Sequence, residues 1–263
     1  SGTRSTIIVA ISLAPIAASS YPDEKDWIKT MEFSRITFLF GVLVFLHAAS
    51  ILIPQEILGA AINWPNSLDF TPRKALPLVA DNLSEIRSGY GIYLFYSIAW
   101  IMVGPLLAWY AMGKNKIAGP LFITAVALIC VSALARAIGI IRWLTASTFL
   151  AQNYESATPE MAQTIELIRD VVNAWGGAIG ELLGVSLFSV GWLICVSILI
   201  LRNDSLPNWL GYFGLIVCPI FASPIIELFG YTANIFVSTL SVHLWLFATG
   251  SVMMYLGLTN KVQ

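Results

Sequence analysis

Six long runs of apolar residues constrain the fold of this chain more than any other feature of its sequence. They cover residues 36–54, 90–112, 117–149, 171–201, 209–230 and 234–256. Each holds at least about 18 mostly apolar residues, enough at a helical rise of ~1.5 Å to cross a bilayer core of ~30 Å. Helices satisfy their own backbone hydrogen bonds in lipid, whereas barrel strands would show alternation over about ten residues. The runs therefore predict an all-α integral membrane protein, a bundle of six transmembrane helices.

The composition supports a membrane location. Hydrophobic residues make up 57% of the chain and charged residues only 11%, against roughly a quarter charged in soluble domains. The net charge of −1 gives no reason to expect nucleic acid as a partner. The third and fourth runs are longer than a bilayer is thick, so we expect these helices to tilt or to project beyond the membrane.

The first 35 residues form a separate, peripheral segment in this interpretation, and the six-helix transmembrane domain covers residues 36–263. Residues 6–18 are apolar but too few to span a membrane, and Pro15 interrupts them. They follow Arg4 and precede small residues, so they resemble the core of a signal peptide. Met31 is an alternative natural start, which would make everything before it an extension.

Basic residues predict the orientation of the bundle. With six spans, both termini lie on one side of the membrane, and that side carries eight lysines and arginines against four on the other. Positive residues favour the inner side, so we expect both termini inside and two long loops, residues 55–89 and 150–170, outside. Aromatic residues near the span ends fit this arrangement; Tyr90 and Trp143 are expected in the outer aromatic belt.

Charged residues within or beside the spans are the main candidates for function, because a charge near mid-helix costs roughly 2.5–3.5 kcal/mol on insertion scales. At ~1.5 Å per residue, six of them reach a similar level in the outer third of the bilayer. These candidate ligand-binding residues are Glu56, Arg87, Arg136, Arg142, Glu181 and Glu227. They predict a polar cavity open to the outer face, with Arg136 paired to Glu181 or Glu227. Alternatively, they are snorkelling residues or ion pairs that set the helix register.

A glycine ridge runs beside one of these charges. Gly176, Gly180 and Gly184 recur every four residues, a small-xxx-small pattern that lets another helix approach closely. Packing within the bundle is its ordinary role, and Glu181 beside it is then expected to face protein. Together with exposed aromatic residues, the ridge is alternatively a contact surface for partner membrane subunits or for a homo-oligomer.

The chain has two histidines, His47 in the first span and His243 in the last. First and last helices are often neighbours in a bundle, so a bis-histidine haem b site is geometrically conceivable. A more ordinary role is a hydrogen bond within the bundle, with Ser50 and Thr239 one turn away. Haem is the one cofactor that the residues suggest, since the three cysteines lack the spacing of a disulfide framework or metal site.

Familiar catalytic motifs are missing: the sequence has no Gly-x-Ser-x-Gly, no His-Glu-x-x-His and no phosphate-binding loop. We therefore predict no catalytic residues. The first hypothesis is a non-enzymatic protein whose outward-facing cavity binds a small amphiphile or lipid headgroup. The second is an accessory subunit of a larger membrane complex. The third is a haem b cytochrome or another membrane enzyme.

Three stretches carry a resemblance to a known family. They are residues 133–138 (ALARAI) with an embedded arginine, residues 173–183 (NAWGGAIGELL), and residues 206–215 (LPNWLGYFGL), which open the fifth span. This pattern, over residues 90–257, resembles a bacterial membrane family catalogued as domain of unknown function 4386. The resemblance implies a six-helix fold in the bacterial plasma membrane and membrane lipids as surroundings. It implies no particular activity.

Overall fold

The computed structural model describes residues 24–113, 119–203 and 205–259. Within these ranges the regular structure is helical, with no β-strand. Six helical stretches are long and apolar enough to cross a membrane, which confirms the predicted bundle. They are Ser34–Ile62, Leu83–Ala111, Pro120–Tyr154, Pro159–Arg202, Asn208–Phe229 and Ile235–Leu258. The signal-peptide-like residues 6–18 lie outside the described ranges.

Several spans consist of more than one helical element, because the type of helix changes or the axis breaks along them. Two short elements, η1 and η4, are 3-10 helices, and two others, η2 and η3, are π-helices. In chain order the elements are α1 (Glu24–Ser50), α2 (Leu52–Ile62), η1 (Asn66–Asp69), α3 (Pro72–Asp81), α4 (Leu83–Ala111), α5 (Pro120–Arg142), η2 (Trp143–Ser147), α6 (Thr148–Tyr154), α7 (Pro159–Gly177), η3 (Ala178–Phe188), α8 (Ser189–Arg202), α9 (Asn208–Phe221), η4 (Ser223–Phe229) and α10 (Ile235–Leu258).

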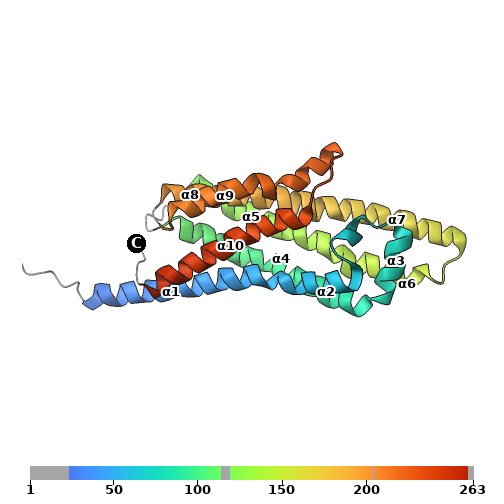
Figure 1. Ribbon diagram of the computed structural model, residues 1–263, viewed down its shortest axis with the longest axis horizontal. Helices are drawn as coiled ribbons and strands as arrows, with labels where there is room; N and C mark the ends of the chain where they lie inside the picture. The colour runs from blue at the N-terminus through green and yellow to red at the C-terminus, as the bar shows by residue number, and fades with distance from the viewer. Residues whose placement is uncertain (1–23, 114–118, 204, 260–263) are drawn as a thin grey trace, which may run out of the picture.

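The first and last helices are neighbours, as expected for such a bundle. α1 packs along α10, α10 along α9, α9 along α8, and α8 along α5, which in turn packs against α4 (Figure 1). α1 and α10 approach closely because Gly41 faces Gly250: a Cβ on Gly250 would lie 2.9 Å from the carbonyl oxygen of Gly41. Small residues at such contacts are the usual means of joining helices in lipid.

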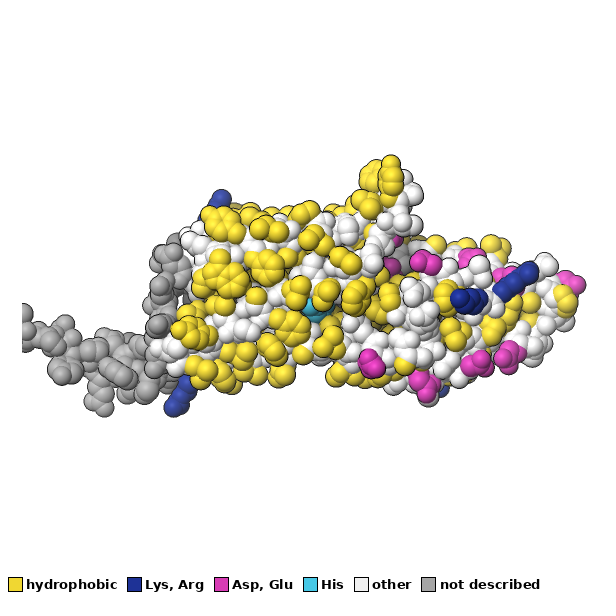
Figure 2. Space-filling model, in the orientation of Figure 1, with side chains coloured by type: hydrophobic (Ala, Val, Ile, Leu, Met, Phe, Trp, Pro, Cys, Tyr) yellow, Lys and Arg dark blue, Asp and Glu magenta, His cyan; other side chains and the backbone are white. Residues whose placement is uncertain are grey.

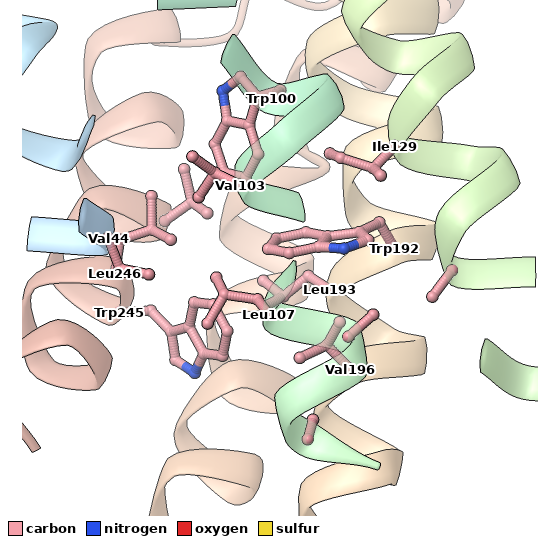
Figure 3. Packing of buried hydrophobic residues seen from close by; sticks show 14 of the residues in the cluster. Val44, Trp100, Val103, Leu107, Ile129, Trp192, Leu193, Val196, Trp245 and Leu246 are labelled. Carbon is pink, nitrogen blue, oxygen red and sulfur yellow. The ribbon is translucent and has the colours of Figure 1, made fainter. Parts of the chain in front are cut away.

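A hydrophobic core fills the membrane part of the bundle. Trp100, Trp192 and Trp245, from α4, α8 and α10, are almost fully buried and meet edge to face. Their ring centroids are 5.1 Å and 6.0 Å apart, a favourable geometry for aromatic pairs. Figure 3 shows the three rings with aliphatic side chains such as Leu193 between them. This core holds three spans together beneath the site described below.

A second, smaller core lies beyond the membrane part. The two stretches predicted as outer loops, residues 55–89 and 150–170, fold instead largely into helices; we call these residues the cap. α3 forms because Pro72 occupies its first position and because Ala75, Leu76 and Val79 bury one face. These side chains pack against the extended ends of α4 and α5. The cap therefore has its own hydrophobic centre.

Two spans project into the cap, as their length predicted. The third covers 35 residues and the fourth 44, about 53 Å and 66 Å of helix against a bilayer core of ~30 Å. Figure 2 shows hydrophobic side chains over the half of the molecule that contains α8, α9 and most of α10, and acidic side chains over the cap and the part next to it. On this face, the division is the one expected of a lipid-facing part and a water-facing part.

Candidate functional site

A small cavity lies where the membrane part of the bundle meets the cap. Its volume is about 40 Å³, room for a few water-sized groups, since one water needs roughly 10–15 Å³. Three of the predicted ligand-binding residues line it: Arg136, Arg142 and Glu181. The other three lie at exposed positions and are not part of its lining. These are Glu56 on α2, Arg87 on α4 and Glu227 on η4.

The cavity is formed by segments far apart in the sequence. α4 contributes Tyr90, Tyr93 and Ser97, and the cap contributes Trp64 and Leu68. α5 and η3 provide the charged residues, and the first residue of α10 completes the lining. Most of these side chains are aromatic or aliphatic, with a small number of polar groups, which is the usual make-up of a binding site.

Glu181 forms an ion pair with Arg142, not with Arg136 as predicted. The Arg142 guanidinium donates to the Glu181 carboxylate over 3.2 Å and to the backbone carbonyl of Gly139 over 3.1 Å. Arg142 is 7% exposed and the Glu181 side chain 27%. The Arg142 side chain occupies the space beside Gly176: a Cβ added to Gly176 would lie only 2.4 Å from Cδ of Arg142. The glycine therefore makes room for this buried arginine.

Arg136 has only neutral partners among the described residues. Its guanidinium donates to Ser189 Oγ over 2.7 Å and lies 5.4 Å from the ring centroid of Trp100. The Ser189 hydroxyl is 2.7 Å from that of Ser132, and both hydroxyls lie within 2.8 Å of the Gly184 carbonyl. Although Arg136 is only 5% exposed, no described carboxylate lies within ion-pair distance of it.

Two π-helices flank the cavity. η3 carries Gly180, Glu181 and Val185, and η2 begins at Trp143. Such i→i+5 segments are rare and are frequent at functional sites. The sequence analysis missed them, because apolar periodicity distinguishes helix from strand but does not distinguish the two kinds of helix. The π-helix turns the side chains of residues 180–185 to directions that an α-helix would not give.

Four buried polar atoms in residues that line the cavity have no hydrogen-bond partner among the described residues. They are Tyr90 OH, Ser97 Oγ, Arg136 Nε and Arg142 Nε. All four residues are more than nine-tenths buried. A buried polar group left without a partner costs roughly 1–3 kcal/mol, and more when charged. Their concentration at one cavity therefore suggests a partner from outside the chain.

Tyr90 and Trp143 do not form part of an outer aromatic belt. Their rings stack at a centroid distance of 4.9 Å and an interplanar angle of 6°, and both are buried between α4 and the end of α5. The prediction failed because residues near a span end face lipid only if no further structure covers them. Here the cap covers them. The exposed Trp175 and Tyr231 remain available for that belt.

The two histidines lie deeper in the bundle, on either side of Tyr96. His47 stacks on the Tyr96 ring at 4.6 Å, and His243 Nε2 lies 2.8 Å from the Tyr96 hydroxyl. His243 Nδ1 lies 2.6 Å from the Thr239 carbonyl, the partner expected one turn away. A haem between the imidazoles would require Tyr96 to move. The haem alternative stays a prediction, which a visible absorption spectrum of the purified protein tests.

The glycine ridge packs inside the chain. A Cβ on Gly180 would lie 2.9 Å from the Cα of Gly139, and one on Gly184 would lie 2.9 Å from the backbone nitrogen of Arg136. η3 and α5 are therefore in backbone contact, which confirms the packing role. The ridge presents no free surface to a partner subunit, and the contact brings Arg136 and Glu181 into the lining of one cavity.

The comparison with protein families decides where this fold belongs. The family model described as "Domain of unknown function (DUF4386)" matches residues 35–256. The chain belongs to this family. The matched region of the DUF4386 protein includes the cap, the cavity and, except for one residue at the start of the first span and two at the end of the last, all six spans. No curated protein and no solved structure matches the chain.

Proposed function

We propose that this DUF4386 protein binds the polar head of a small amphiphile or lipid in the cavity beneath its cap. The observation that carries the proposal is that four of the residues lining the cavity, Tyr90, Ser97, Arg136 and Arg142, each have a buried polar atom without a hydrogen-bond partner among the described residues. The position of the cavity favours an amphiphile.

The cavity lies between the two hydrophobic cores of the molecule. On one side is the hydrophobic core of the membrane part, which includes Trp100. On the other is the second, smaller core, in which Tyr90 and Trp143 pack against side chains of the cap. A ligand with its head on the polar groups of the cavity and its tail on apolar surface would suit a polar cavity set among apolar side chains.

The size of the cavity limits what enters. A volume of about 40 Å³ admits a carboxylate- or phosphate-sized head but not a whole drug-sized ligand, which needs roughly 300–1,000 Å³. The tail would therefore lie outside the cavity, among membrane lipids. With both termini inside, as the basic residues predict, the head would come from the outer leaflet of the plasma membrane.

A pair of serine substitutions tests the proposal. Ser97 and Ser186 are both fully buried with an unpartnered hydroxyl, but only Ser97 lines the cavity. Ser97→Val puts a larger, apolar side chain into the cavity and should lower the amount of amphiphile retained several-fold. Ser186→Val is the matched control and should leave retention unchanged. Native mass spectrometry of the purified protein, and analysis of its solvent extract, measure the retained amphiphile.

Equal retention in the two variants would contradict the proposal. So would a wild-type protein that retains no amphiphile and gains none when oleate or phosphatidylglycerol is added. Thermal unfolding of each variant provides the check that a loss of retention reflects the cavity and not a loss of folded protein.

A further inference from the structure

We infer that the head bound in this cavity carries a single negative charge and that Arg136 is the residue that recognises it. The inference rests on the proposed function and adds the chemical class of the ligand. A carboxylate, from a fatty acid, or a phosphodiester, from an anionic lipid, has this chemistry.

The charges on the cavity wall do not cancel. Arg142 and Glu181 neutralise each other at 3.2 Å. Arg136 is left with a serine hydroxyl and the face of a tryptophan ring. The lining residues therefore carry one uncompensated positive charge. An unpaired charge buried in a membrane protein is costly, and such residues generally pair with a counter-charge or mark a ligand site.

The unpartnered atoms agree with an anion. The two arginine Nε groups can only donate hydrogen bonds, and the hydroxyls of Tyr90 and Ser97 can donate as well. A ligand that satisfies all four must supply acceptors. Carboxylate and phosphate oxygens do so, and they match the planar guanidinium group well. An ammonium head supplies no acceptor and would meet the positive charge of Arg136.

The experiment compares amphiphiles that differ only in the head. Oleate, oleyl alcohol and oleylamine share a tail, and each is titrated into the full chain held in phosphatidylcholine nanodiscs. Oleate should bind about 10- to 100-fold more tightly than oleyl alcohol, the usual size of a charge-assisted contact. Oleylamine should bind no better than the alcohol. A further arm exchanges part of the phosphatidylcholine for phosphatidylglycerol, which should compete with oleate.

Substitutions assign the selectivity to one residue. Arg136→Gln should bring oleate and oleyl alcohol to equal affinity, whereas Arg136→Lys should keep part of the preference. Arg87→Gln is the control, because it removes an exposed arginine that lies outside the cavity. It should leave the preference unchanged. The wild-type comparison decides the charge class even if Arg136→Gln fails to fold.

The possible results separate the two proposals. Equal affinity of the wild type for oleate and the alcohol overturns the anionic head but leaves an amphiphile site. If none of the amphiphiles binds, both the amphiphile site and the anionic head are overturned. If inorganic phosphate alone binds, the anion site is supported and the amphiphile site is overturned. A preference for oleate that survives Arg136→Gln overturns the assignment to Arg136.

Discussion

At the scale of single residues, two arginine–glutamate pairs of nearly equal length differ in burial. Arg142 and Glu181 meet at 3.2 Å with the arginine 7% exposed, whereas Arg73 and Glu166 meet at 3.1 Å with the arginine 75% exposed. When one residue of a buried ion pair is removed, the charge of the other is left without its partner and with little water around it. We therefore expect the two pairs to differ strongly in their contribution to stability.

Arg142→Gln should lower the free energy of unfolding by about 3 kcal/mol. This is the lower end of the loss expected when one partner of a buried ion pair is removed, because Glu181 keeps some access to solvent. Arg73→Gln should change it little, as is usual for exposed pairs. Unfolding followed in mixed micelles at increasing denaturant gives both values. Equal losses in the two variants would mean that the buried pair is no more important than the exposed one.

At the scale of elements, the contact between α5 and η3 depends on glycine. Gly180→Ala would place a methyl group 2.9 Å from the Cα of Gly139, so the two helices must separate. We expect a loss of about 1–3 kcal/mol, typical of overpacking, together with weaker amphiphile retention because Arg136 and Glu181 move apart. Unfolding and native mass spectrometry measure the two effects.

Gly177, three residues earlier in α7, is the matched control. A Cβ there would have its nearest neighbours at 3.6 Å and 3.9 Å, ordinary contact distances. Gly177→Ala should be tolerated or slightly stabilising, since alanine favours helix over glycine. Similar destabilisation by both substitutions would indicate that helix propensity, and not the backbone contact, matters in this segment.

At the scale of the whole molecule, the orientation in the membrane is still a prediction. The structure places the start of α1 and the end of α10 at one end of the bundle and the cap at the other (Figure 1). Glu160→Cys, exposed in the cap, and Thr259→Cys, exposed after α10, mark the two ends. In intact cells a membrane-impermeant maleimide should label only Glu160→Cys, because the positive-inside rule puts the cap outside.

Labelling of Thr259→Cys alone would reverse the orientation, and with it the leaflet from which an amphiphile enters. The unsubstituted protein gives the background, since Cys195 and Cys218 are buried and Cys130 is partly buried. Labelling of both positions after the cells are permeabilised shows that both thiols can react.

The sequence by itself determined the membrane bundle. Span length and apolar character are local properties that need only be compared with the thickness of a bilayer, so all six spans were predictable. The level of Arg136, Arg142 and Glu181 was also predictable, because helical rise converts residue number into height. Height along a helix, however, says nothing about the direction in which a side chain points.

Tertiary structure decided that direction and therefore the site. The π-helix η3 and the glycine contact with α5 set which arginine meets Glu181, and Arg142 forms the pair that had been expected of Arg136. The cap decided that Tyr90 and Trp143 are buried. Glu56, Arg87 and Glu227 were predicted to lie at similar heights, but they do not line the cavity. These outcomes depend on contacts between segments that are far apart in the sequence. No local sequence pattern shows which of these segments will meet.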